Sequence, residues 1–259
     1  ALNKKGHQLQ VQEDRRVTLP WTDPHLRLLR GITLDEEQVQ AARAALEKRA
    51  CHIQGVTAFG KTEVMFTVYE CLRQKAPTRA LLLVTQSPLV DQTYQRAIKY
   101  FGPDQVHLVE GKDPELPGEG LVVSTYHTMW IRLFGLIRRG KKGRVSVKPS
   151  LKMRQWVKGV DLLLCDEAHR VPGDSRDAMY REVVAHVRAS YRLGVSATPK
   201  VLNNPARNMA LRAWVGDLAF TADEQAQVGK GRIAMTHVWW RIVGLESPLP
   251  RTYPGSPAQ

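Results

Sequence analysis

The composition is that of a foldable, basic protein. The chain has 259 residues, of which 38 are Lys or Arg and 25 are Asp or Glu, so its net charge is +13, and 43% of its residues are hydrophobic. These fractions are typical of globular proteins and exclude a mainly disordered or fibrous chain. No apolar run approaches the roughly 18 residues that a membrane-spanning helix needs. The surplus of positive charge favours a polyanionic partner, either nucleic acid or an anionic membrane surface.

The chain ends and the cysteines bear on location. The first ten residues contain lysines with no apolar segment behind them, so we expect no secretory signal. Cys51, Cys71 and Cys165 have no CxxC spacing, which argues against a zinc site and for a reducing, cytoplasmic setting. We expect these thiols to be buried as small hydrophobic groups. We expect residues 1–32 to be an N-terminal extension and the proline-rich residues 246–259 to be a tail or linker.

Regular structure is expected from residue 33, where Thr33 and Glu36 have the spacing of a helix capping box. The elements predicted in chain order are a helix at 34–48, a strand at 51–54, a helix at 61–74, a strand at 80–85, a helix at 88–100, strands at 105–109 and 121–125, a helix at 126–138, a strand at 160–165, a helix at 177–188 and a strand at 191–195. Short apolar runs without polar alternation are typical of strands buried on both faces. Strands alternating with helices predict an α/β fold, a parallel sheet with helices on both faces in three layers.

A phosphate-binding loop lies between the first predicted strand and the second helix. Residues 55–62 satisfy GxxxxGKT at every fixed position. Backbone N–H groups and the helix N-terminus would hold phosphates, Lys61 would reach the β and γ phosphates, and the Thr62 hydroxyl would bind Mg²⁺. A solvated glycine-rich turn is the alternative. The pattern predicts a P-loop NTPase whose nucleotide contacts are Gly55, Thr57, Ala58, Phe59, Gly60, Lys61, Thr62 and Glu63.

An acidic pair follows the buried strand at 160–165. Asp166 is the candidate Mg²⁺ ligand, and Glu167 is the candidate to position or deprotonate the attacking water. An Asp-Glu pair in a surface loop is the alternative, and it is disfavoured because this pair ends an apolar strand in a chain that already has a phosphate loop. Lys61, Asp166 and Glu167 are therefore the predicted catalytic residues, with ATP and Mg²⁺ as cofactors.

With these motifs the sequence resembles the first RecA-like domain of a superfamily 2 helicase or translocase of the DEAH type. Ser196-Ala197-Thr198-Pro199 looks like the SAT motif of that family, residues 83–92 (LVTQSPLVDQ) resemble motif Ia, and residues 122–127 (VVSTYH) resemble motif Ib. Gln38, 23 residues before Lys61, is similar to the glutamine that recognises adenine. The likeness covers residues 33 to 199 and is closer to phage recombination helicases and restriction-type motors than to DEAD-box RNA helicases.

The resemblance implies further roles. It implies that His169, Ser196 and Thr198 couple the ATP site to the nucleic acid. It also implies that motifs Ia and Ib touch the backbone of the bound strand, through Ser87, Pro88, Gln92 and Thr125.

The loop departs from the family in having Ala58-Phe59 where small residues are usual, and we expect binding to survive because the loop works through its backbone N–H groups. Helicases of this kind also take arginine fingers from a second RecA-like domain. Arg232 lies in a similar pattern, but the spacing is off by one and only 36 residues separate it from Ser196, so we reject it as a finger. We therefore expect one domain at 33–245, a second domain in a longer chain or a partner subunit, and weak ATP hydrolysis by this chain alone.

A basic insert at about 132–158 separates the Ib-like and DEAH motifs. Between residues 121 and 160 there are ten Lys or Arg and no Asp or Glu. Gly140, Gly143 and Pro149 indicate an extended loop or hairpin. A solvated charged loop is the alternative, but the absence of acids favours phosphate binding by Arg138, Arg139, Lys141, Lys142 and Arg144.

The sequence thus predicts an ATP-dependent nucleic-acid motor, with DNA preferred over RNA and no membrane partner. The alternative is a RecA-like module that binds nucleic acid under ATP control without unwinding it, in a defence, restriction or repair complex. A small-molecule kinase is disfavoured because it explains neither the SAT motif nor the basic insert. Trp239 and Trp240 could stack on bases, although burial is the more usual fate of such a pair.

Overall fold

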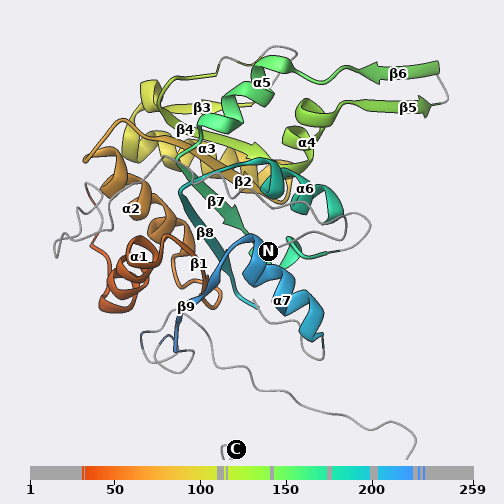
Figure 1. The fold of residues 1–259 in the computed structure, drawn as a ribbon. Coiled ribbons are helices and arrows are strands. Elements are labelled where there is room, and N and C mark those ends of the chain that lie inside the picture. The colour runs from red at the N-terminus through yellow and green to blue at the C-terminus, as the bar shows by residue number, and fades with distance from the viewer. Residues whose placement is uncertain are drawn as a thin grey trace, which may run out of the picture.

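Seven parallel strands form one sheet in the computed structural model of the chain (Figure 1). The structure describes residues 31, 33–109, 114, 116–140, 143–173, 177–198, 204–223, 227 and 230. The predicted extension at 1–32 lies outside these residues, except for Gly31. So do Pro199, Arg232, Trp239, Trp240 and the tail at 246–259. None of the helices within them is long and apolar enough to cross a membrane.

The strands follow the spatial order β3-β4-β2-β7-β8-β1-β9, and every neighbouring pair is parallel. Their bounds are β1 (Ala50–Gln54), β2 (Arg79–Val84), β3 (Val106–Leu108), β4 (Gly120–Thr125), β7 (Leu162–Asp166), β8 (Tyr191–Ser196) and β9 (Asp217–Thr221). In the central strands, residues 80–84 and 162–165 are fully or almost fully buried, as their unbroken apolar sequences predict.

Helices cover both faces of this sheet. Leu82 and Leu164 pack with α1 (Glu36–Lys48), α2 (Lys61–Arg73) and α3 (Ser87–Phe101). Leu83 and Leu163 point to the other face, because side chains alternate along a strand, and pack with α4 (Tyr126–Phe134), α5 (Leu151–Trp156), α6 (Ala178–His186) and α7 (Pro205–Trp214). The predicted three-layer α/β fold is therefore confirmed.

The predicted helix at 126–138 is wrong in its last turn. Helix α4 ends at Phe134, because Gly135 has a φ of 83° and its N–H donates to the carbonyl of Ile131 at 2.8 Å. The chain continues as the antiparallel hairpin of β5 (Leu136–Gly140) and β6 (Gly143–Val147), which extends away from the main sheet (Figure 1, upper right). Of the two forms expected for the basic insert, the hairpin is the one observed.

Other differences are local. The capping box of α1 uses Asp35 and Gln38, not Thr33 and Glu36. The short helix α5 and the elements α7 and β9 have no counterpart among the predicted elements. Within the described residues three short 3-10 helices also occur, η1 (Pro103–Gln105), η2 (Val157–Gly159) and η3 (Ala168–Arg170). Helix α5 has six residues, too few for a clear helical period.

Arg192 fixes β8 to the helices behind it. Its guanidinium donates to the carbonyls of Trp214 at 2.9 Å and Val187 at 2.5 Å, at the C-terminal ends of α7 and α6. Burial lowers its pKa. These bonds satisfy carbonyls that a helix leaves unpaired at its end, and they hold the strand that ends at Ser196.

Candidate active site

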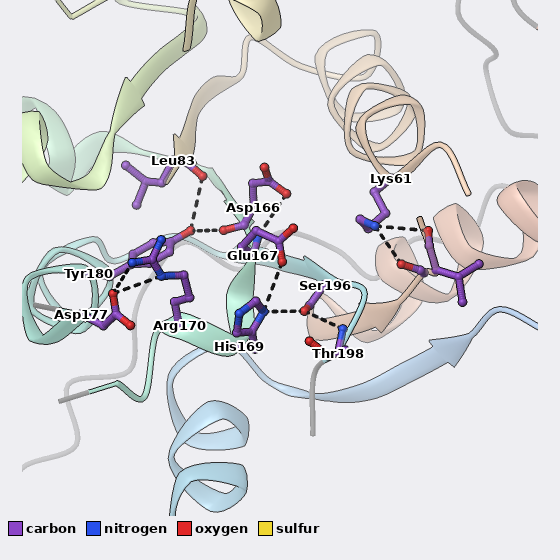
Figure 2. Close-up of polar contacts among 12 residues, drawn as sticks. Lys61, Leu83, Asp166, Glu167, His169, Arg170, Asp177, Tyr180, Ser196 and Thr198 are labelled. Atoms are coloured by element: carbon purple, nitrogen blue, oxygen red, sulfur yellow. Dashed lines mark hydrogen bonds and ion pairs between the residues drawn. The ribbon is translucent and has the colours of Figure 1, made fainter. Parts of the chain in front are cut away.

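The carboxyl ends of β1, β7 and β8 bring the predicted motifs together. Gln54 pairs with Ser196, and Asp166 pairs with Val195, so the chain leaves all three strands at one edge of the sheet. Figure 2 shows Lys61, Asp166, Glu167, His169, Ser196 and Thr198 around this edge. In parallel α/β sheets this edge is where ligands bind.

The phosphate loop, residues 55–62, is tied to the third motif through its first residue. The N–H of Gly55 donates to the carbonyl of Ser196 at 2.9 Å. Ala58 and Gly60 have φ values of 63° and 86°, a left-handed backbone that a small residue and a glycine tolerate best. Within the described residues no side chain caps α2, so its first N–H groups and its positive dipole end face the loop. The loop is therefore built to receive an anion.

Phe59 is the unusual residue of the loop, and its side chain is in the core. It is fully buried, and its ring stacks on Phe220 of β9 with centroids 6.0 Å apart. A Cβ atom at Gly55 would come within 2.6 Å of the Phe59 ring, so the glycine makes room for it. Of the predicted nucleotide contacts, Phe59 can therefore offer only its backbone.

Gln38 is held against the loop. Its Nε2 donates to the carbonyl of Phe59 at 2.7 Å, and its Oε1 accepts from the N–H of Asp35 at 2.9 Å. The residue is 6% exposed, and a Cβ atom at Gly60 would overlap its Nε2 atom. In this position Gln38 braces the phosphate loop, while its predicted contact with adenine stays a prediction.

Lys61 is aligned along the loop. Its ammonium donates to the carbonyls of Gly55 at 2.8 Å and Val56 at 3.2 Å (Figure 2). Burial lowers its pKa, and the nearby carboxylates of Glu167 and Asp166 act in the opposite direction. Thr62 follows at the start of α2, and it is partly exposed.

Glu63 lies between the phosphate loop and α3, and a Cβ atom at Gly60 would come within 3.4 Å of its Oε2 atom. It is 7% exposed and forms an ion pair with Arg96. Its side chain therefore has a partner within the domain, and its predicted nucleotide contact stays a prediction.

The two acidic residues differ in environment. Burial, and next the charge of Glu167, raise the pKa of Asp166. The hydrogen bond from His169 lowers the pKa of Glu167. Glu167 has φ 49° and ψ 50°, a left-handed conformation that costs a non-glycine residue about 1–2 kcal/mol. Its N–H donates to Oδ1 of Asp166 at 3.0 Å, so the two residues are fixed relative to each other.

A polar chain links the acidic motif to the SAT-like motif. The Nδ1 atom of His169 lies 3.2 Å from Oε2 of Glu167 and 2.7 Å from Oγ of Ser196. The same Oγ accepts from the N–H of Thr198 at 3.1 Å. All three residues predicted to couple ATP and nucleic acid are thus connected to each other and to Glu167 (Figure 2).

The residues predicted to bind nucleic acid lie in two places. A cavity of about 420 Å³ between the ends of β2 and β4 is lined by Thr85, Gln86, Ser87, Thr125, Tyr126, His127, Thr128 and Met179. Of the predicted contacts, Ser87 and Thr125 line it, whereas Pro88 and Gln92 are exposed on α3.

The other place is the hairpin, where Arg139 of β5 pairs with Arg144 of β6 in the backbone register and Arg138 precedes them. Lys141 and Lys142 lie outside the described residues, as do the side chains of Arg138, Arg139 and Arg144.

Three contacts were not anticipated from the sequence. Gln227 and Lys230, in the pattern that superficially suggested an arginine finger, bind the carboxylate of Glu37 at 2.5 and 2.8 Å. The hydroxyl of Tyr180 donates to the backbone carbonyl of Asp166 at 2.8 Å. Nothing in the sequence signals any of these contacts, because the partners are 190, 193 and 14 residues apart and belong to no shared motif.

The fold and the phosphate loop define a RecA-like domain of the P-loop NTPase class. The sequence matches the profile of the family described as "Type III restriction enzyme, res subunit" over residues 31–201. The chain belongs to this family.

Solved structures show the same fold at low identity. The UvsW helicase from bacteriophage T4 is 14% identical with a TM-score of 0.55, over 73% of this chain and 60% of the other. The Hef helicase domain from Pyrococcus furiosus is 21% identical with a TM-score of 0.57, over 77% and 41%. The SWI2/SNF2 ATPase core from Sulfolobus solfataricus in complex with dsDNA is 12% identical with a TM-score of 0.51, over 74% and 37%.

The chain thus spans 60% of the UvsW structure and less than half of the other two. Among curated proteins there is no match.

Proposed function

We propose that this chain is the first RecA-like domain of a DNA translocase or helicase, which binds Mg-ATP and hydrolyses it in response to bound DNA. The observation that carries the proposal is the position of Ser196. Its carbonyl accepts from Gly55 in the phosphate loop, and its hydroxyl contacts His169 of the acidic motif. One residue therefore touches both halves of the nucleotide site, as a coupling element must.

The residues present fit a nucleotide with Mg²⁺. The uncapped end of α2 and the Lys61 ammonium supply positive charge for the phosphates. The Thr62 hydroxyl and the Asp166 carboxylate supply oxygen ligands, which Mg²⁺ prefers. No group of three or more His, Cys, Asp or Glu in the described part of the chain could by itself hold a metal ion. When bound, Mg²⁺ would offset negative charge on the phosphates.

Glu167 is suited to act on water. The hydrogen bond from His169 lowers the pKa of Glu167 and so favours the ionised carboxylate, which can accept a hydrogen bond from a water. His169 in turn contacts Ser196, so the orientation of Glu167 depends on the SAT-like motif. We infer that movement of residues 196–198 changes the position of this base.

The nucleic-acid surface is proposed to combine the 420 Å³ cavity and the basic hairpin. Hydroxyl and amide groups line the cavity, and such groups hold phosphates in register without reading bases. DNA is preferred over RNA because one of the similar solved structures, the SWI2/SNF2 ATPase core, is in complex with dsDNA. The domain is proposed to occupy residues 33–245, with a second RecA-like domain, in a longer chain or a partner subunit, supplying arginine fingers.

The experiment is to measure ATP hydrolysis by the full-length protein with no nucleic acid, with single-stranded and duplex DNA, and with RNA. We expect the highest rate with DNA. Lys61→Ala should abolish binding or turnover, and Glu167→Gln should keep ATP binding while lowering turnover by about 10²–10⁴-fold. DNA-stimulated hydrolysis that persists in Lys61→Ala would overturn the site assignment.

A non-unwinding module in a restriction complex is the second candidate, favoured by the description of the matched family. It shares the ATP and DNA sites with the first candidate. Strand-displacement assays on the full-length protein separate the two, since only a helicase releases a labelled strand from a duplex in the presence of ATP.

A further inference from the structure

Two tyrosines fill the space between the proposed DNA cavity and the end of β7. Tyr180 of α6 is fully buried, and Tyr126 at the start of α4 is 7% exposed. Their rings are stacked, with centroids 4.7 Å apart and planes at 6°. Tyr126 lines the cavity, and Tyr180 contacts Asp166. The pair therefore forms a packed connection between two sites that are proposed to communicate.

The Tyr180 hydroxyl contacts two backbone carbonyls and the thiol of Cys165. It donates to the Asp166 carbonyl at 2.8 Å, and the Leu83 carbonyl lies 3.3 Å away (Figure 2). The Asp166 carbonyl belongs to the peptide that joins Asp166 to Glu167, and the N–H of the same peptide donates to Oδ1 of Asp166. Both ends of this peptide are thus held by hydrogen bonds, and the peptide joins the backbones of the two acidic residues.

Leu83 is the penultimate residue of β2, directly before the segment with Thr85, Gln86 and Ser87 that lines the cavity. The hydroxyl therefore lies between the backbone that ends in the cavity wall and the backbone that carries the acidic pair.

Arg170 joins this arrangement from the acidic side. Its guanidinium lies over the Tyr126 ring, 5.8 Å from the centroid, and pairs with Asp177 through Nε at 3.1 Å and Nη2 at 2.7 Å. Arg170 directly follows His169 in the chain. The Tyr126 ring is consequently held between Tyr180 and a residue of the acidic segment, and it cannot shift without disturbing one of them.

We propose that Tyr180 is a positioning residue that orients the Asp166–Glu167 peptide. Binding of DNA in the cavity would change the placement of Tyr126, and the stacked rings would transmit this change to Tyr180. This inference rests on the proposed DNA-stimulated ATPase. DNA bound in the cavity favours one placement of Tyr126, the stack transmits this placement to Tyr180, and the hydroxyl sets the direction of Glu167. The coupling free energy equals the difference between the binding free energies of DNA for the two placements of Tyr126.

The experiment compares Tyr180→Phe with wild type in the full-length protein. The substitution keeps the ring and the stack and removes only the hydroxyl. We expect the ratio of DNA-stimulated to basal kcat to fall about fivefold, the loss that one hydrogen bond of ordinary strength predicts, while the KM for ATP changes less. Tyr69→Phe is the matched control, because Tyr69 is equally buried and its hydroxyl has no hydrogen-bond partner among the described residues. It should keep the wild-type ratio.

A second pair of variants tests the ring stack. Tyr126→Leu should lower the ratio as Tyr180→Phe does, whereas Tyr126→Phe, which keeps the ring, should restore it. The double variant Tyr126→Leu with Tyr180→Phe should lose little more than either single variant, since both act on one connection. If Tyr180→Phe fails to fold, as thermal unfolding would show, the Tyr126 pair decides the question.

The outcomes separate the two proposals. A wild-type protein whose ATP hydrolysis is indifferent to DNA sinks the proposed function and this inference with it. If DNA stimulates the wild type and Tyr180→Phe has the same ratio of DNA-stimulated to basal kcat, the inference is wrong and the proposed function stands. A fall of basal and stimulated rates by the same factor also overturns it, because that is the result of a purely structural role.

Discussion

The side chain of Ser196 lies between two parts of the nucleotide site, with its Oγ atom 2.7 Å from Nδ1 of His169. The same Oγ accepts from the N–H of Thr198, and the Ser196 carbonyl accepts from Gly55. The hydroxyl and the carbonyl can therefore be tested separately, because an alanine removes only the first.

Ser196→Ala should uncouple hydrolysis from DNA while preserving nucleotide binding. The bond between the Ser196 carbonyl and Gly55 survives in the alanine variant, so the affinity for ATP should stay close to that of wild type. Loss of the contact with His169 should lower DNA-stimulated kcat by about 2–10-fold, the range expected for one hydrogen bond. Steady-state kinetics with and without DNA check this. Ser190→Ala, just before the opposite end of β8, is the control, and a weakened ATP affinity in Ser196→Ala would contradict the prediction.

Gln38→Met should weaken binding of ATP and GTP alike. Methionine has a similar shape but cannot donate to the Phe59 carbonyl, so the phosphate loop loses its brace whichever base is bound. We expect a loss of about 2–10-fold for both nucleotides. Equilibrium titration with fluorescent analogues measures it, with Gln40→Met on the exposed face of α1 as the control. A loss confined to ATP would instead support direct recognition of adenine by Gln38.

Replacing Arg138, Arg139, Lys141 and Lys142 with alanine should weaken DNA binding and flatten its dependence on salt. Each lost phosphate contact lowers the slope of log K against log salt by about 0.9 for duplex DNA. Binding measured at several salt concentrations gives this slope, and Lys75, which follows α2, offers a control substitution. An unchanged slope would mean that the hairpin is a solvated charged loop that does not bind DNA phosphates.

Alkaline pH should destabilise the fold partly through two thiols. Burial raises the pKa of Cys51 and of Cys165 to about 12. Above pH 9 the unfolded chain loses these protons and the folded chain keeps them, so the free energy of unfolding falls as the pH rises toward 12. Each thiol should contribute a loss of about 1 kcal/mol between pH 9 and 10.

Urea unfolding at several pH values measures this loss. In Cys165→Ala the free energy of unfolding should fall less with rising pH, by the contribution of one thiol. If the variant and the wild type depend on pH identically, the assignment to Cys165 is wrong.

Much of the fold was predictable because its signals are local. The buried strands are continuous apolar runs, and the phosphate loop and the Asp166–His169 segment are contiguous motifs, so each could be recognised from its own residues. The parallel sheet follows from the alternation of strands and helices. The end of α4 was misplaced because the apolar period continues past Gly135, and only the left-handed φ of that glycine shows the turn into the hairpin.

The sequence by itself determined which chemical groups are present, a phosphate loop, an acidic pair and a basic insert, since these depend on neighbouring residues. The tertiary structure decided what those groups touch. Phe59 in the loop stacks on Phe220, Gln38 reaches the Phe59 carbonyl, and Tyr180 holds the Asp166 peptide. The physical reason is that these contacts join separate elements packed around one sheet. Contacts between distant elements produce no periodic pattern in the sequence.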